Sequence, residues 1–438
     1  MSLPAPVPPL IIPIPHDTAT MIHSLCQYFT STTMFGPIQP HEIPIAQRVP
    51  QEILLEIFRR IPFAPAPYRD TIVYPYLESR EYARSATARD TRAGLPLVCQ
   101  RWNGPATEIL YEEVDVSSLH AAKMLLQALE SARGPALGEM IKTLRLPARA
   151  DVGRSRRVRD PFPGAVPDII EGIVRRCSPA LKSLSYSTAA TQPGLGIFWE
   201  PRFPQGIFLT NLHLSSSYSI DGAPLPPLDV HRHLQSATLA SFVFDRTAGV
   251  LSCPASLRSL TLNSCIFDYG WDVHHPEPAM LTSLTFNICT CIDSQLPAHL
   301  LEHLGSLDVY RTPSLSYDLA RAPHLTQLAL APSQSAPQFG WGEYVPHGVK
   351  RLTLGVFDPH DIEELEILVF PLARDLELVR LYICCKLDTF ESTCLDRISV
   401  QLRVMGVQEV KVIWDARVDE WILREWILLS VRSATKMH

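Results

Sequence analysis

Apolar residues recur from residue 141 onwards in a six-residue pattern whose first, fourth and sixth positions are apolar. The clearest copy is Leu257-x-x-Leu260-x-Leu262, and a weaker one has Ala237 at its fourth position. Copies begin at Ile141, Leu181, Leu209, Leu234, Leu257, Leu281, Leu304, Leu325, Val349, Leu378 and Val407. The apolar residues two apart at the end of each copy are typical of a short strand with one buried face, so we expect one strand per copy.

From the second copy onwards, successive copies begin 21 to 29 residues apart. This period and pattern are those of a leucine-rich repeat, in which stacked copies bury together the side chains that one copy cannot bury alone. The sequence therefore predicts an α/β fold whose main part is a solenoid with a curved parallel sheet. Helical return segments are expected at Pro167–Cys177, Leu296–Leu304, Asp361–Phe370 and Ser392–Met405. A helix over Val418–Val431, with Trp421 and Trp426, is expected to cap the C-terminal end of the solenoid.

A different pattern precedes the repeats and predicts short helices. Between Val49 and Pro62 the apolar residues recur at helical spacing, with proline at the first helical position and again at the end. They are Ile53, Leu54, Ile57, Phe58 and Ile61. Between Leu95 and Tyr111, Val98 and Trp102 lie four apart on one helical face, and Gly104-Pro105 is expected to break the helix. Helices this short cannot bury a self-sufficient core, so their apolar faces need another surface.

These two segments resemble an F-box. The first reads Val-Pro-x-Glu-Ile-Leu-x-x-Ile-Phe-x-x-Ile-Pro and the second Leu-x-Leu-Val-Cys-x-x-Trp. The resemblance covers 49–62 and 95–113 and is closest to the fungal F-box-like form, in which an insertion, here 63–94, separates the halves. It implies that the helices dock the Skp-type adaptor protein of a cullin–RING ubiquitin ligase. The matching positions are Val49, Pro50, Ile53, Leu54, Ile57, Phe58, Ile61, Pro62, Leu97, Val98, Cys99 and Trp102, some of which must pack the module internally.

The chain thus divides into a Pro-rich tail (1–44), expected to be disordered, a helical F-box-like module (45–116) and a solenoid (117–438). An F-box followed by leucine-rich repeats resembles the non-catalytic substrate receptors of SCF-type ubiquitin ligases, whose repeats hold a target protein. In an alternative interpretation the chain is a protein-interaction scaffold unconnected to ubiquitin, and the helices cap the first repeat.

Residues between the last two apolar positions of each copy should point away from the core, onto the open face of the sheet. This row reads His213, Thr238, Thr261, Thr285, Asp308, Ala329, Thr353, Tyr382 and Lys411, and a neighbouring row contains Arg351, Arg380 and Glu409. The predicted target-binding residues are His213, Thr261, Thr285, Asp308, Thr353 and Tyr382. Ordinary exposed strand residues would give the same row, so both interpretations stay open.

Composition narrows the remaining function classes. The net charge of −6 argues against nucleic acid as a partner. The 39 prolines, against 20 glycines, favour short helices and strands over long ones. Because the sequence shows no secretory leader, we expect the ten cysteines to be reduced. No apolar run is long enough to span a membrane, so we expect a soluble protein of the cytoplasm or nucleus. Catalytic motifs are absent, and Cys289-x-Cys291 and Cys384-Cys385 lack the spacing of a zinc site. We therefore expect no enzymatic activity, metal or cofactor.

Overall fold

The structure, a computed structural model, falls into two compact units. It describes residues 50–59, 95, 100–116, 119–146, 165–188, 208–216, 225, 228–244, 250–267, 272–277, 280–291, 294–310, 312, 315–316, 318–331, 345–356, 362, 365, 369–383 and 389–414. Among the described residues, the first unit ends at Glu113 and the second begins at Val114. The predicted tail 1–44, the insertion 63–94 and the C-terminal helix Val418–Val431 lie outside the described residues.

The first unit contains two described helices, α3 (Gln51–Arg59) and α5 (Gln100–Glu112). The helix expected after Val49 is present, but the predicted break at Gly104-Pro105 is wrong, because α5 runs through it. Pro105 gives up one backbone hydrogen bond, but Gly104 has no Cβ to clash with the proline ring. Pro105 is buried together with Ala106 and Ile109. We infer that this packing outweighs the lost bond.

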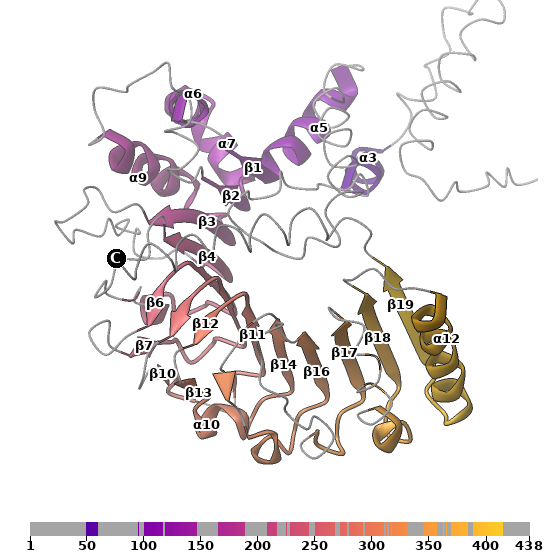
Figure 1. Ribbon diagram of the computed structural model, residues 1–438. Helices are drawn as coiled ribbons and strands as arrows, with labels where there is room; N and C mark the ends of the chain where they lie inside the picture. The colour runs from indigo at the N-terminus through magenta and orange to yellow at the C-terminus, as the bar shows by residue number, and fades with distance from the viewer. Residues whose placement is uncertain are drawn as a thin grey trace, which may run out of the picture. The chain divides into compact units, whose positions relative to one another are not determined.

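The second unit is built on a twelve-stranded sheet, and every pair whose register is described is parallel. The order is β1 (Glu113–Asp115), β2 (Thr143–Arg145), β3 (Ser183–Thr188), β4 (Asn211–Ser216), β5 (Ser236–Ala240), β8 (Ser259–Asn263), β11 (Ser283–Asn287), β14 (Ser306–Tyr310), β16 (Gln327–Ala331), β17 (Arg351–Val356), β18 (Leu378–Ile383) and β19 (Glu409–Trp414). Figure 1 shows strands β11 to β19 following a curve, with α10 (Ala298–Leu301) and α12 (Thr389–Val404) outside it. The predicted leucine-rich-repeat architecture is confirmed.

A repeated pair of backbone hydrogen bonds fixes the register between neighbouring repeats. The carbonyl of Arg258, just before β8, accepts bonds from the N–H groups of Thr282 (2.9 Å) and Ser283 (3.0 Å) of the next repeat. The same arrangement recurs at the carbonyls just before the strands from β2 to β17; that of Thr326, for example, accepts from Lys350 and Arg351. Because these bonds hold the start of each strand to the start of the preceding one, neighbouring strands begin at equivalent positions along the sheet.

This register corrects the position of one predicted copy. Leu352 of β17 is paired with Val379, and Leu354 is paired with Leu381. The copy therefore reads Leu376-x-x-Val379-x-Leu381, two residues earlier than the predicted copy beginning at Leu378. Leu376 is buried, as the first apolar position requires. A slip of two keeps every side chain on the same face of a strand, so the hydrophobic pattern alone did not distinguish the two registers.

The core of the solenoid consists of the inward apolar positions of the repeats together with residues of the return segments. Phe244 stacks on Phe267, with ring centroids 4.7 Å apart, and Phe267 meets Phe286 edge to face, with centroids 5.7 Å apart. Phe244 and Phe267 lie in a small outer sheet formed by β6 (Val243–Phe244), β9 (Ile266–Phe267) and β12 (Thr290–Cys291). The other outer strands pair β7 (Leu251–Ser252) with β10 (Val273–His274) and β13 (Ser294–Gln295) with β15 (Leu315–Ser316).

The return segments at the two ends of the solenoid are the most helical. They are α6 (Leu119–Glu130), α7 (Gly134–Met140), α9 (Ala165–Cys177) and α12, while short 3-10 turns occur at Leu228–Val230, Leu319–Arg321 and Phe370–Leu372. Of the helix predicted over Asp361–Phe370, only Ile362, Leu365, Val369 and Phe370 are described, the first three as helical. Among the described residues, no helix combines the length and apolar character needed to cross a bilayer.

The corrected register can be tested with neighbouring substitutions in β18. Val379 is fully buried, whereas Leu378 is partly exposed on the opposite face. We expect Val379→Asn to lower the free energy of unfolding by about 3 kcal/mol, because it buries an amide and removes apolar packing. We expect Leu378→Asn to lower it by about 1 kcal/mol or less. Chemical denaturation of the two variants would measure both values, and the opposite ranking would contradict this register.

Candidate functional site

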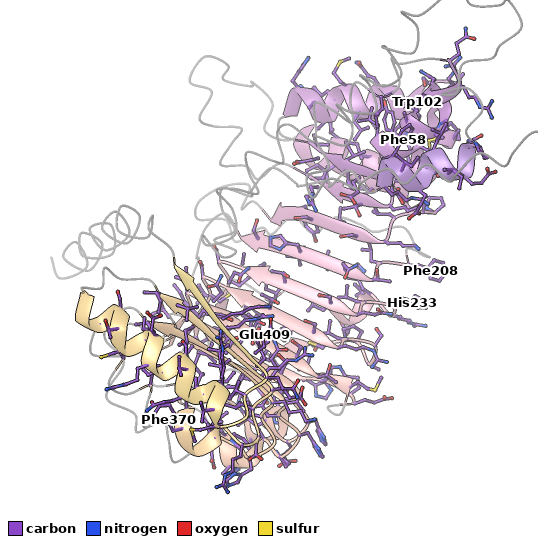
Figure 2. All side chains as sticks on the ribbon, turned by 90° about the vertical axis from the view of Figure 1, so that its right-hand side faces the viewer. Phe58, Trp102, Phe208, His233, Phe370 and Glu409 are labelled. Atoms are coloured by element: carbon purple, nitrogen blue, oxygen red, sulfur yellow. The ribbon has the colours of Figure 1, made fainter. Side chains whose placement is uncertain are left out.

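The two helices of the first unit enclose a small core of their own. The ring of Phe58 on α3 meets the ring of Trp102 on α5 edge to face, with centroids 5.1 Å apart (Figure 2). Leu54, Phe58 and Ile109 are almost completely buried. The complete cluster is Leu54, Phe58, Leu95, Trp102, Ala106 and Ile109, with Leu55 and Ile57 packed against it. An edge-to-face ring pair of this kind adds about 0.5–1.5 kcal/mol beyond the burial of its area.

This core divides the predicted adaptor-binding residues into two groups. Leu54, Phe58 and Trp102 are interior residues of the helix pair, so in this structure their side chains do not offer a docking surface. They are thus among the predicted positions that pack the module internally, because the two short helices use them to bury each other. Six predicted positions lie outside the described residues or side chains: Val49, Ile61, Pro62, Leu97, Val98 and Cys99.

The remaining three predicted residues form what we call the α3 stripe: Pro50, Ile53 and Ile57. Their spacing of three and then four residues places them on one face of the helix. Pro50 is exposed, Ile53 is 51% exposed and Ile57 is partly exposed. An isolated exposed isoleucine is ordinary. Here Ile57 packs partly against the core, and the same apolar face continues through Ile53 to Pro50, just before the helix, which makes it a candidate contact surface.

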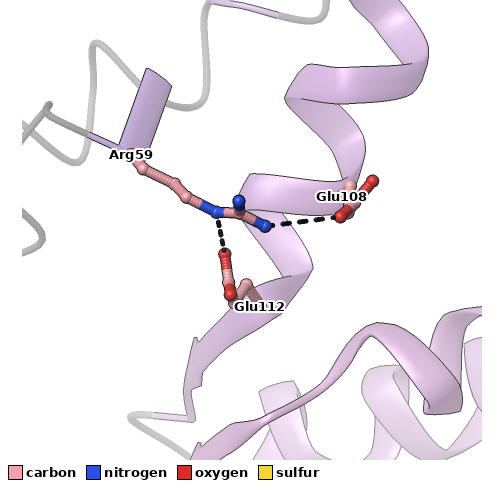
Figure 3. A network of polar contacts seen from close by, with 3 residues as sticks. All are labelled: Arg59, Glu108 and Glu112. Carbon is pink, nitrogen blue, oxygen red and sulfur yellow. Dashed lines mark hydrogen bonds and ion pairs between the residues drawn. The ribbon is translucent and has the colours of Figure 1, made fainter. Parts of the chain in front are cut away.

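Arg59 at the end of α3 links that helix to α5. Its Nε donates to Oε2 of Glu112 at 3.4 Å, and its Nη2 lies 3.7 Å from Oε1 of Glu108 (Figure 3). The three side chains remain partly exposed, and ion pairs of this kind contribute at most about 1 kcal/mol. The contact aligns the two helices, while the aromatic core supplies most of their stability.

The second candidate surface is the open face of the sheet. The register brings most of the predicted row into one line across the strands: His213, Thr238, Thr261, Thr285, Asp308, Ala329, Thr353 and Lys411. Tyr382 does not belong to this row. It is paired with Gly355, and Arg380 takes its place between Thr353 and Lys411. The sequence did hold a signal for this. Had the copy been started at Leu376 instead of Leu378, the residue between its last two apolar positions would have been Arg380.

Two ionisable residues of the row are partly buried, which changes their pKa values. Burial raises the pKa of the Asp308 carboxyl to about 6, although a hydrogen bond from the Thr285 side chain opposes the shift. Burial lowers the pKa of His213 to about 4, and the positive charge of Arg145 adds to that shift. At neutral pH the imidazole is therefore uncharged, and Asp308 carries a charge that its surroundings disfavour.

Metal-ligating residue types do not gather in the described part of the chain. Among the described side chains, no group of three or more His, Cys, Asp and Glu residues is placed to hold a metal ion. Cys289 is buried with its thiol directed at the carbonyl of Leu262, 3.1 Å away, and the side chains of Cys291, Cys384 and Cys385 are outside the described set. What the described surface offers is therefore shape, hydrogen bonding and charge.

The raised pKa of Asp308 gives a test of the open face. Between about pH 4 and 6 the folded chain retains a proton that the unfolded chain has lost, so the contribution of Asp308 to stability falls as the pH rises through this window. We expect Asp308→Asn to raise the free energy of unfolding by about 1–3 kcal/mol at pH 7.5 and to change it little at pH 4. His213 is present in both the wild type and the variant, so its pH dependence cancels when their free energies of unfolding are subtracted. The difference therefore reports Asp308 alone. An equal effect at both pH values would contradict the assignment.

Comparisons with known proteins add little to this geometry. No family model matches the chain, and no curated protein matches it. Among solved structures it is similar to the crystal structure of the LRIM1/APL1C complex, with 14% identity and a TM-score of 0.29 over 70% of this chain and 61% of that chain. At this identity and TM-score the likeness supports no conclusion about function, and the chain spans less than two thirds of that protein. The leucine-rich-repeat assignment rests on the strand ladder itself.

Proposed function

We propose that this chain is a non-catalytic substrate receptor of an SCF-type, cullin–RING ubiquitin ligase. In this proposal the first unit docks the Skp-type adaptor of the ligase, and the open face of the solenoid binds the target protein. The solenoid fold favours the target-binding half, since the curved sheet of repeat proteins is a common protein-binding surface. The adaptor-binding half starts from the F-box resemblance of segments 49–62 and 95–113.

The observation that carries the adaptor-binding half is the α3 stripe. The helix pair satisfies its own core with Leu54, Phe58 and Trp102, yet Ile53 remains 51% exposed beside Pro50 and Ile57. A helix whose apolar face extends past its core, as Ile53 extends the face on which Ile57 packs, is suited to lie against a groove of another protein. Burying Ile53 in such a groove would contribute about 1–2 kcal/mol from its exposed half.

The proposed receptor performs no bond-making step. Holding a target on one unit while another engages the ligase raises the effective concentration of the target's lysines near the ubiquitin donor. Both surfaces needed for this consist of residues suited to binding, the apolar α3 stripe and the hydroxyl-rich row of the open face. No cofactor or metal is required.

We expect Ile53→Asp to abolish capture of a purified Skp-type adaptor by the full chain. The substitution removes an apolar contact and places a charge in the interface, so affinity should fall by about 30-fold or more. Gln51→Asp is the matched control, since it adds the same charge elsewhere on α3 and should leave capture intact. Quantitative pull-down followed by a binding titration would measure both effects.

Stability controls separate docking from folding. Ile53→Asp should leave the melting curve close to that of the wild type, because the side chain is half exposed. Phe58→Ala, by contrast, should destabilise the helix pair by about 3–5 kcal/mol and reduce capture only through unfolding. If the wild-type chain fails to bind the adaptor, or if Ile53→Asp binds as well as wild type, the ligase-receptor proposal fails and a leucine-rich-repeat scaffold remains.

A further inference from the structure

The open face carries a cluster of positive charge at its C-terminal end, which we call the basic patch: Arg351, Arg380 and Lys411. These residues lie on the adjacent strands β17, β18 and β19. Arg380 is directly paired with Lys411, and Arg351 lies diagonally from Arg380, because their pairing partners are Leu378 and Thr353. Their neighbours Leu352, Val379 and Val410 are buried on the other face, so all three basic side chains share the open face.

Two of the three basic side chains form no close ion pair with a carboxylate of the described residues, although the charge of Arg380 acts on the nearby Glu409. Lys411 Nζ is 2.6 Å from Oε1 of Glu409 on its own strand. Just before β17 and β18, Lys350 Nζ is 3.0 Å from Oε1 of Glu377. Arg351 and Arg380 form no ion pair with any described residue. Their positive charge is therefore available to another molecule.

This arrangement is unfavourable for the fold by itself. Like charges directly opposite each other on neighbouring strands destabilise a sheet, and Arg380 faces Lys411. The nearby Glu409 offsets part of the repulsion, since its pKa is lowered by its bond to Lys411 and by the charges of Lys411 and Arg380. Elsewhere the same row has uncharged residues such as Thr238, Thr261 and Thr285. The fold thus concentrates positive charge at one place where it is not needed for pairing.

We propose that the basic patch binds an extended segment of the target protein that carries aspartate or glutamate at alternate positions. Neighbouring strands are about 4.8 Å apart, and a diagonal across one strand pair spans about 7–8 Å. Alternate side chains of an extended peptide are about 6.6 Å apart. Two carboxylates separated by one residue can therefore meet Arg380 and Arg351 together, each through the paired N–H donors of a guanidinium.

The surroundings of the patch favour a short carboxylate segment over a continuous polyanion. Glu409, labelled in Figure 2, pairs with Lys411, and Glu377 lies just before β18, so a phosphate backbone crossing the strands would meet negative charge as well. The chain as a whole is acidic, with a net charge of −6. Beside β17 the face is uncharged, with Gln327 and Ala329, which suits the neutral residues that flank an acidic pair.

This inference rests on the target-binding half of the proposed function and is independent of the adaptor. Substitutions in the basic patch should leave adaptor capture unchanged, and Ile53→Asp should leave peptide binding unchanged. Failure of one proposal is therefore distinguishable from failure of the other.

The test is a fluorescence-anisotropy titration of the full chain with labelled peptides. The probe is a twelve-residue Gly/Ser peptide with an Asp-Ser-Asp-Ser-Asp centre, and its matched control replaces each aspartate with asparagine. We expect the aspartate peptide to bind at low ionic strength at least about tenfold more tightly than the control and to weaken as salt is added. Arg351→Gln combined with Arg380→Gln should weaken its binding by about tenfold or more, whereas Arg374→Gln, an exposed arginine outside the strand, should not.

A charge reversal completes the design. Arg351→Glu with Arg380→Glu should lose the aspartate peptide and bind a peptide with lysines at the same positions. Removing Arg380 relieves a like-charge pair, so Arg380→Gln should melt at the wild-type temperature or above it. Equal binding of the asparagine peptide, undiminished binding by the double Gln variant, or binding of a phosphoserine peptide without the aspartate peptide would each overturn the proposal.

Discussion

The whole second unit depends on one interaction, the backbone ladder that joins each repeat to the next in register. From β2 to β17, a carbonyl just before each strand accepts two N–H groups from the next repeat, as Arg258 does from Thr282 and Ser283. The inward apolar side chains would be exposed in an isolated repeat and become buried only when copies stack. Because the ladder and the buried rows require the same register, neither can shift without disrupting the other.

The same constraint creates the surface that we propose to be functional. With the strands in step, residues at equivalent positions form continuous rows across the open face, whatever their identity. Thr261, Thr285 and Asp308 lie in one row for this reason, and so do Arg380 and Lys411. A charge introduced at any repeat therefore acts beside its equivalents in the neighbouring repeats. Repeat proteins can vary their specificity in this way without changing the fold.

Much of this fold was predictable from the sequence, because the stacked leucines leave a period that chance does not produce. The location of strand β18 was not, since Leu376 and Leu378 both begin an acceptable pattern and a slip of two preserves the buried face. Arg380 was consequently placed in the neighbouring row. The continuous helix α5 was also missed, because local propensity at Pro105 was outweighed by burial.

The candidate docking surface shows a second limit of sequence. The pattern of α3 identified its apolar residues but not which of them face α5. Ile53 and Leu54 are adjacent and equally apolar, yet one is half exposed and the other buried. That division depends on where Trp102 of α5 lies, which is a tertiary contact and leaves no mark in the spacing along α3.

The register of the ladder is the claim on which the basic patch and the open face depend, and a cross-link measures it directly. Thr353 and Arg380 are directly paired, so Thr353→Cys with Arg380→Cys should form a disulfide under mild oxidation, because paired positions fall within its Cα–Cα range of about 4.4–6.8 Å. Thr353→Cys with Tyr382→Cys should not, since the offset of two residues separates the Cα atoms by about 8 Å. Peptide mapping by mass spectrometry would identify the products. A disulfide in the second variant and none in the first would contradict the register.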